Sequence, residues 1–211
     1  LIFFFPILLG TFFQQMYNTV DTIIVGRFVS TRALAAVGTT GPLVNMFSGF
    51  FTGLSSGATV ILAQFYGAND PKGVDRTLHT GFSLSLILGL LVTAVGCGLG
   101  PTILTWMQTP EECLEMAGTY LRIYFAGSLA SMVYNMEAGI LRAMGDSRTP
   151  VYSLAAACIV NIIMDIVLVV YGRMGVAGAA LATVLSQVIS AGMLLVVLLR
   201  QRDFPLRCGE L

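Results

Sequence analysis

The chain has 211 residues, of which 56% are hydrophobic and 10% are charged, and its acidic and basic side chains balance to a net charge of zero. Soluble domains carry charge on about 25% of their residues, so this composition excludes an ordinary soluble protein. It predicts an all-α, polytopic membrane protein that lies in a lipid bilayer. No basic tract is present, so we expect no nucleic acid partner.

Apolar segments separated by short polar breaks predict six membrane-spanning helices. About 20 apolar residues cross the hydrocarbon core, and five segments reach that length. A sixth, the first, begins abruptly at Leu1 inside an apolar run, so we expect the chain to be a piece of a longer protein. In chain order the expected helices are 1–26, 34–65, 78–106, 115–141, 150–171 and 175–200. Residues 1–200 are therefore expected to form one transmembrane unit, with 201–211 following it.

Basic residues gather at one end of the predicted bundle. The 66–77 loop, the 142–149 loop and the tail hold most of the cations, whereas the other end holds fewer cations and a cluster of glutamates. By the positive-inside rule, these two loops and the tail are expected to be cytoplasmic. The first and fifth helices then run outward, which places Asp21 and Asp165 in the outer half of the membrane.

Two aspartates, Asp21 and Asp165, lie inside these otherwise apolar segments. A charged side chain at the bilayer centre costs about 2.5–3.5 kcal/mol on insertion scales, so such acids face a cavity and serve a function. Gln14 and Asn18 precede Asp21 at helical spacing, and Asn161 precedes Asp165 by one turn, so each set lines one helix face. The two polar faces predict a proton or cation site between helices, and hence a transporter.

The last predicted helix opens with small residues that let helices approach closely. Thr183 lies about 12 Å along this helix at 1.5 Å per residue, near the depth expected for Asp165. Its hydroxyl either joins the same site or bonds to its own helix backbone. The four cysteines are far apart and show no CxxC spacing, so neither a disulfide framework nor a metal site is expected, apart from Na⁺ itself.

Polar, aromatic and methionine side chains in the helices are candidates for an adaptable substrate cavity, because methionine-rich walls repack around varied ligands. The candidates are Asn18, Met132, Tyr134 and Met136. Packing against lipid is the alternative use of such side chains. Glu137 also lies in an apolar segment, and we interpret it as a snorkelling acid or an ion-pair partner of Arg142.

Several stretches occur in an order and spacing typical of one family. They are Val20-Asp-Thr-Ile-Ile-Val-Gly-Arg27 with Ala33-Leu-Ala-Ala-Val-Gly38, Ala63-Gln-Phe-Tyr-Gly-Ala68, Leu141-Arg-Ala-Met-Gly-Asp146, Asn161-Ile-Ile-Met-Asp165 and Gly175-Val-Ala-Gly-Ala-Ala-Leu-Ala-Thr183. With them the chain resembles the multidrug and toxic compound extrusion (MATE) family of cation-coupled antiporters. The resemblance implies two six-helix lobes around a central cavity. This chain would cover the N-terminal lobe, and 201–211 would begin the cytoplasmic linker.

The resemblance also implies a cation or proton site in this lobe. Its roles fall on Asp21, Asn161, Asp165 and Thr183, with Gln14 as a further polar neighbour. Pro6 resembles the proline at which the first helix bends in the branch of the family that is coupled through its N-terminal lobe. The carboxylate, amide and hydroxyl oxygens of this set suit Na⁺ as well as H⁺, and the set does not separate the two ions.

We therefore expect an antiporter of the cell membrane that exports organic, often cationic, drugs or toxic compounds against H⁺ or Na⁺. It would not be an enzyme, would need no cofactor, and would work with the missing C-terminal lobe. The alternative is a flippase for a lipid-linked precursor. The cavity of a flippase should contain several cationic side chains that bind phosphate groups, and in this sequence Arg122 is the main candidate for such a side chain. An intramembrane aspartyl protease lacks its Gly-x-Gly-Asp pattern here, and a channel subunit gives no reason for the Asn161–Asp165 pair.

Overall fold

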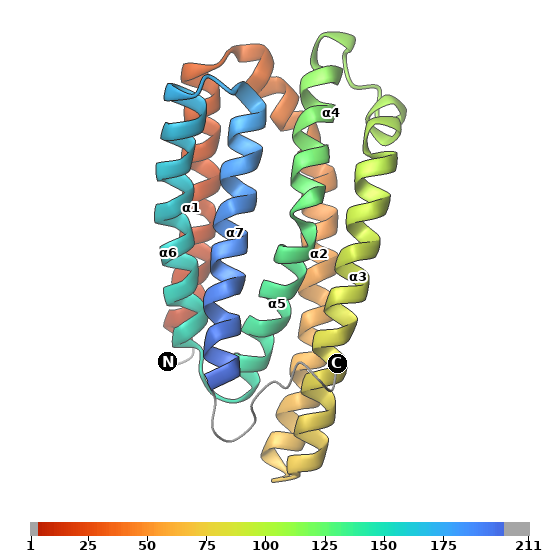
Figure 1. Ribbon diagram of the computed structural model, residues 1–211, viewed down its shortest axis with the longest axis vertical. Coiled ribbons are helices and arrows are strands. Elements are labelled where there is room, and N and C mark those ends of the chain that lie inside the picture. Colours follow the sequence, from red (N-terminus) through yellow and green to blue (C-terminus); the bar gives the residue numbers. More distant parts are fainter. Residues whose placement is uncertain (1–3, 201–211) are drawn as a thin grey trace.

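The computed structural model describes the backbone of residues 4–200 and the side chains of residues 8–200, and this part of the chain contains helices and no strand (Figure 1). The all-α prediction is therefore confirmed. The elements in chain order are α1 (Phe4–Phe28), α2 (Thr31–Gly67), α3 (Pro71–Trp106), α4 (Glu111–Ala126), α5 (Ser128–Ala143), α6 (Arg148–Asp165), the π-helix η1 (Ile166–Tyr171) and α7 (Gly175–Arg200).

Helices α2 and α3 both begin earlier than the predicted residues 34 and 78, because side-chain caps start them. The Ser30 hydroxyl accepts a hydrogen bond from the backbone N–H of Ala33 at 3.1 Å. The Asp70 carboxylate accepts from the N–H groups of Lys72 and Gly73, each at 3.1 Å, and Pro71 fills the first helical position. Both arrangements satisfy N–H groups that have no partner within the helix.

The predicted helix 115–141 is two helices, α4 and α5, which meet at Gly127. A side chain at Gly127 would lie 2.5 Å from the Val184 side chain, so the absence of one lets this junction approach α7 closely. Each piece has 16 residues, which is short of the length needed to cross the membrane alone. The two together are long enough for one crossing, and the chain changes direction where they meet (Figure 1).

The predicted helix 150–171 changes its hydrogen-bond pattern directly after Asp165. There α6 gives way to η1, and the N–H of Gly172 donates to the carbonyl of Val167, five residues earlier, at 2.8 Å. Single π-helical turns inside α-helices are rare and occur mainly at functional sites. The backbone conformation alone therefore identifies the segment beside Asp165 as a candidate functional position.

The helices form two groups that α7 joins (Figure 1). Helix α1 packs against α6 and η1, and α2 and α3 pack against each other and against α4 and α5. Helix α7 contacts α6 on one side and α4 and α5 on the other. Within the described residues four stretches are long and apolar enough to cross a membrane: Thr31–Gly67, Pro71–Trp106, Arg148–Tyr171 and Gly175–Arg200.

The α2–α3 and α5–α6 connections and the end of α7 lie at the same end of the molecule (Figure 1). These are the segments expected to be cytoplasmic, so the fold allows that topology, and the membrane orientation stays a prediction. Pro6 lies in the first described turn of α1. A bend at Pro6 also stays a prediction.

Candidate ion site and adjoining cavity

Asp21 on α1 and Asp165 on α6 are buried neighbours. Their side chains are 7% and 0% exposed, and their carboxyl groups are close enough to interact directly. Among the described residues no hydrogen bond of ordinary geometry satisfies Asp21 Oδ1 or either carboxyl oxygen of Asp165. Buried carboxyl groups are normally hydrogen-bonded or paired with a cation, so this pair is a candidate site for a proton or a cation.

Asn161 lies one helical turn before Asp165 on α6, and Thr183 is buried on α7, which packs against α6. Asn161 is 0% exposed, and neither its Oδ1 nor its Nδ2 makes an ordinary hydrogen bond to a described residue. The buried Thr183 hydroxyl donates to the backbone carbonyl of Ala179 at 3.1 Å. This hydrogen bond to its own helix is one of the two alternatives that the sequence predicted for Thr183. A hydroxyl that donates its proton keeps lone pairs, so Thr183 can still offer its oxygen to a cation.

Two tyrosines that sequence reasoning did not assign to the site lie beside the acids. Tyr120 on α4 is within electrostatic reach of both Asp21 and Asp165, and Tyr17 on α1 is within reach of Asp21. Tyr120 is buried and stacks on Tyr124, with ring centroids 6.3 Å apart. For Tyr17 the sequence did contain a signal, because Tyr17 precedes Asp21 by one helical turn and therefore lies on the same face of α1.

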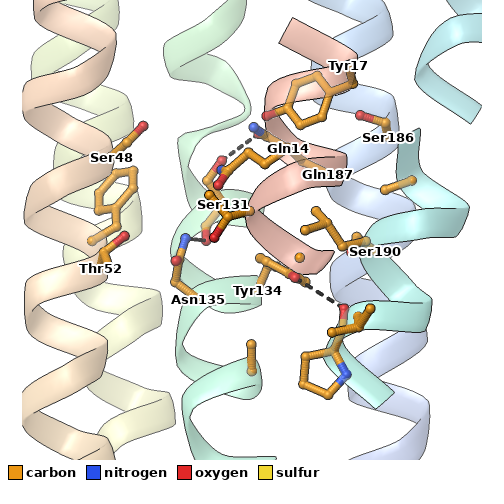
Figure 2. Close-up of a pocket in the computed structure, with 18 of the residues that line it drawn as sticks. Gln14, Tyr17, Ser48, Thr52, Ser131, Tyr134, Asn135, Ser186, Gln187 and Ser190 are labelled. Carbon is orange, nitrogen blue, oxygen red and sulfur yellow. Dashed lines mark hydrogen bonds between the residues drawn. The ribbon is translucent and has the colours of Figure 1, made fainter. Parts of the chain in front are cut away.

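A cavity of about 320 Å³ adjoins this region and is drawn in Figure 2. Tyr17 lines the cavity, so a single turn of α1 separates its wall from Asp21. Gln14 and Tyr134 also line it, which places Gln14 at the cavity, although the sequence had grouped it with the ion site. Asp21, Asn161, Asp165 and Thr183 are not among the lining residues. The candidate ion site and the cavity are therefore adjacent but distinct.

Three of the residues expected at the cavity lie elsewhere. Met132 and Met136, one turn apart on α5, are fully buried in the hydrophobic core, and Met136 packs against Gly81 of α3. The cavity is on another face of α5, which carries Tyr134. Asn18 is exposed and does not line the cavity. The helical period fixed which side chains share a face, but not which face looks inward.

The interpretation of Glu137 as a snorkelling acid or a partner of Arg142 is wrong. Glu137 is 0% exposed, and neither of its carboxyl oxygens has a hydrogen-bond partner among the described residues. Five helical positions separate it from Arg142, which corresponds to about 140° around the axis, so the two side chains point apart.

Within the described residues no group of three or more His, Cys, Asp or Glu side chains is arranged to hold a metal ion.

The family model for MatE matches residues 6–167 of this chain, which is more than half of its length and includes Asp21, Asn161 and Asp165. The chain belongs to the MATE family. Members of this family are transporters rather than enzymes, so this MATE chain is a multi-pass protein of the cell membrane.

Individual relatives agree with this assignment. The MATE chain is 34% identical over 186 residues to the probable multidrug resistance protein YpnP of Bacillus subtilis (strain 168), covering 88% of this chain and 42% of that protein. It is 31% identical over 210 residues to the probable multidrug resistance protein YoeA of the same organism, covering 98% and 45%. A crystal structure of MATE in the bent conformation superposes with a TM-score of 0.91 at 29% identity, covering 98% and 46%. The chain thus spans less than half the length of these relatives.

Proposed function

We propose that the protein containing this chain is an antiporter that exports organic compounds, drugs among them, across the cell membrane in exchange for H⁺ or Na⁺. The observation that carries the proposal is the pair Asp21 and Asp165, two neighbouring buried carboxyl groups. Asp21 Oδ1 and both carboxyl oxygens of Asp165 lack ordinary hydrogen bonds, and neither acid has a cationic partner among the described residues. The names of the relatives, which are multidrug resistance proteins, support drugs as substrates.

The acid pair gives a physical reason for a coupling ion. A carboxylate away from water is costly unless it is paired, and two adjacent carboxylates also repel each other. A proton on the pair, or a Na⁺ held between them, removes both costs. The oxygens of Asn161 and Thr183, on α6 and α7, complete a set suited to a hard cation such as Na⁺.

Occupancy of this site would act on the packing of α1. Helix α1 supplies Asp21 and packs against α6 and η1, and α6 supplies Asp165. Loading the site draws these elements together, and emptying it leaves two charges in contact. Because Tyr17 of α1 lines the cavity one turn away, a shift of α1 changes the cavity wall. Binding of the ion would in this way change the shape of the substrate cavity.

The complete transporter would need a second lobe. Alternating access requires two halves that move against each other around a shared site, and the described helices form one such half. The C-terminal lobe is therefore the proposed partner of this chain. A flippase for lipid-linked precursors is less well supported, because the cavity described here presents one cationic side chain, Arg142, where phosphate groups call for several.

Efflux from membrane vesicles tests the proposal. Vesicles that hold the full-length protein and a fluorescent drug would be given a pH gradient and, separately, a Na⁺ gradient, with wild type and Asp165→Asn compared. We expect efflux to follow at least one gradient and to disappear in the variant. The matched control is Asp75→Asn, an acid on α3 that lies outside the site and should leave efflux unchanged. Efflux that ignores both gradients would overturn the coupling.

A further inference from the structure

The charge of the cavity wall is unusual for a site expected to take organic cations. Of the 21 described residues that line the cavity, one is charged, and it is Arg142. No aspartate or glutamate is among them. The three buried acids among residues 8–200, Asp21, Glu137 and Asp165, all lie outside the lining. A cationic ligand would therefore find no carboxylate in this cavity.

The remaining polar wall consists of neutral hydrogen-bonding groups from several helices (Figure 2). Some of them are held in place by one another. The Ser131 hydroxyl donates to Gln187 Oε1 in a hydrogen bond between α5 and α7, and the Asn135 amide donates to the Ser131 carbonyl at 2.8 Å. Gln14 of α1 adds a third side-chain amide to this wall, beside Asn135 and Gln187. Such a wall suits the neutral body of a ligand that both donates and accepts hydrogen bonds.

Arg142 is available to a ligand. It is exposed in the last turn of α5, and no ion pair to a described residue engages it. The acid that follows it in sequence, Asp146, is already used, because its carboxylate accepts hydrogen bonds from the backbone N–H groups of Arg148 and Thr149, each at 3.0 Å. A guanidinium without a carboxylate partner is a ready site for a planar anionic group.

We propose that this cavity selects ligands that carry an anionic oxygen group, such as a carboxylate, bound by Arg142, with a neutral hydrogen-bonding body that lies along α1, α5 and α7. The inference rests on the proposed function, because it treats the cavity as part of the transport path. It departs from the expectation of mainly cationic substrates. In this proposal Asp21 and Asp165 bind the coupling cation, whereas the cavity wall favours ligands with an anionic group.

Two dyes that differ at one group test the charge preference. Rhodamine 123 is the methyl ester of rhodamine 110, so rhodamine 110 alone presents a carboxylate on the same ring system. Fluorescence anisotropy would measure the equilibrium binding of each dye to the purified full-length protein. We expect rhodamine 110 to bind more tightly, and Arg142→Gln to weaken its binding by roughly 10- to 100-fold, the range for a lost hydrogen bond to a charged group. Rhodamine 123, a cation without a carboxylate, should bind to the variant at least as well as to wild type.

Two further variants separate a direct contact from a general effect. Arg148→Gln removes a nearby cation that does not line the cavity and should change neither dye, whereas Arg142→Lys should keep part of the preference for rhodamine 110. Tighter binding of rhodamine 123 by wild type would overturn the proposal. So would an equal loss of both dyes in Arg142→Gln, the same effect from Arg148→Gln, or no binding of either dye. Equilibrium binding needs no ion gradient, so a failure of antiport would leave this result standing.

Discussion

Replacing either acid of the ion site by its amide should remove most of the affinity for the coupling ion. Asp165 is fully buried and Asp21 nearly so, and their oxygens have few protein partners, so a bound cation would interact mainly with these carboxylates. Removing one partner of a buried charge pair costs about 3–5 kcal/mol. At about 1.4 kcal/mol per tenfold change, Asp21→Asn and Asp165→Asn should each weaken binding by roughly 100- to 4,000-fold.

The double variant distinguishes one shared site from two separate sites. If both carboxyl groups hold the same ion, either single change already destroys the site, and the double variant should bind about as weakly as the weaker single one. The measurement is equilibrium binding of radioactive sodium to the purified full-length protein, paired with proton uptake in unbuffered solution. Both signals are needed because either ion can occupy the pair.

Glu137→Gln is the matched control for this experiment. Glu137 is as buried as Asp165 and its oxygens also lack ordinary hydrogen bonds, but it lies on α5 and belongs to neither the ion site nor the cavity lining. Ion binding should therefore survive this change. Equal losses from Glu137→Gln and Asp165→Asn, or additive losses from the two aspartates, would refute the reasoning.

Three further changes should alter stability, each read from the thermal midpoint of the purified full-length protein. Glu137→Met should raise stability by about 1–3 kcal/mol, because it replaces a buried carboxyl without ordinary hydrogen bonds by an apolar side chain; a lower midpoint would show that Glu137 has a stabilising partner. Gly96→Ala should cost about 1–3 kcal/mol, since its Cβ would lie 2.3 Å from the Phe125 ring, whereas Gly98→Ala meets nothing within 4 Å and should be neutral or stabilising. Asp70→Ala should cost about 1 kcal/mol through the lost cap of α3, and an unchanged midpoint would count against that cap.

The helical class and the buried acids were readable from the sequence because both follow from the cost of polar groups in an apolar setting. An aspartate in an apolar segment must be buried or paired, and the structure buries Asp21 and Asp165 side by side. The early starts of α2 and α3 also had signals, in Ser30 and in the Asp70–Pro71 pair, which are typical N-terminal caps.

Other features depend on how helices pack, which periodicity does not contain. At the break between α4 and α5, Gly127 lies so close to Val184 of α7 that a side chain would not fit, and this contact joins positions far apart in the sequence. The same limit explains the methionines, since one turn separates Met132 from Met136 whichever face of α5 points inward. Glu137 was misread because nearness in sequence to Arg142 was taken for nearness in space.

The central claim is that ion and substrate move in opposite directions through one mechanism, and ion movement driven by substrate tests it most directly. Vesicles with the full-length protein would be loaded with a transported drug and diluted into drug-free buffer, with no ion gradient imposed. The account predicts inward movement of Na⁺ or H⁺ that depends on the drug gradient and is absent in Asp165→Asn. Drug leaving the vesicles without any ion movement, or ion movement unchanged in the variant, would contradict it.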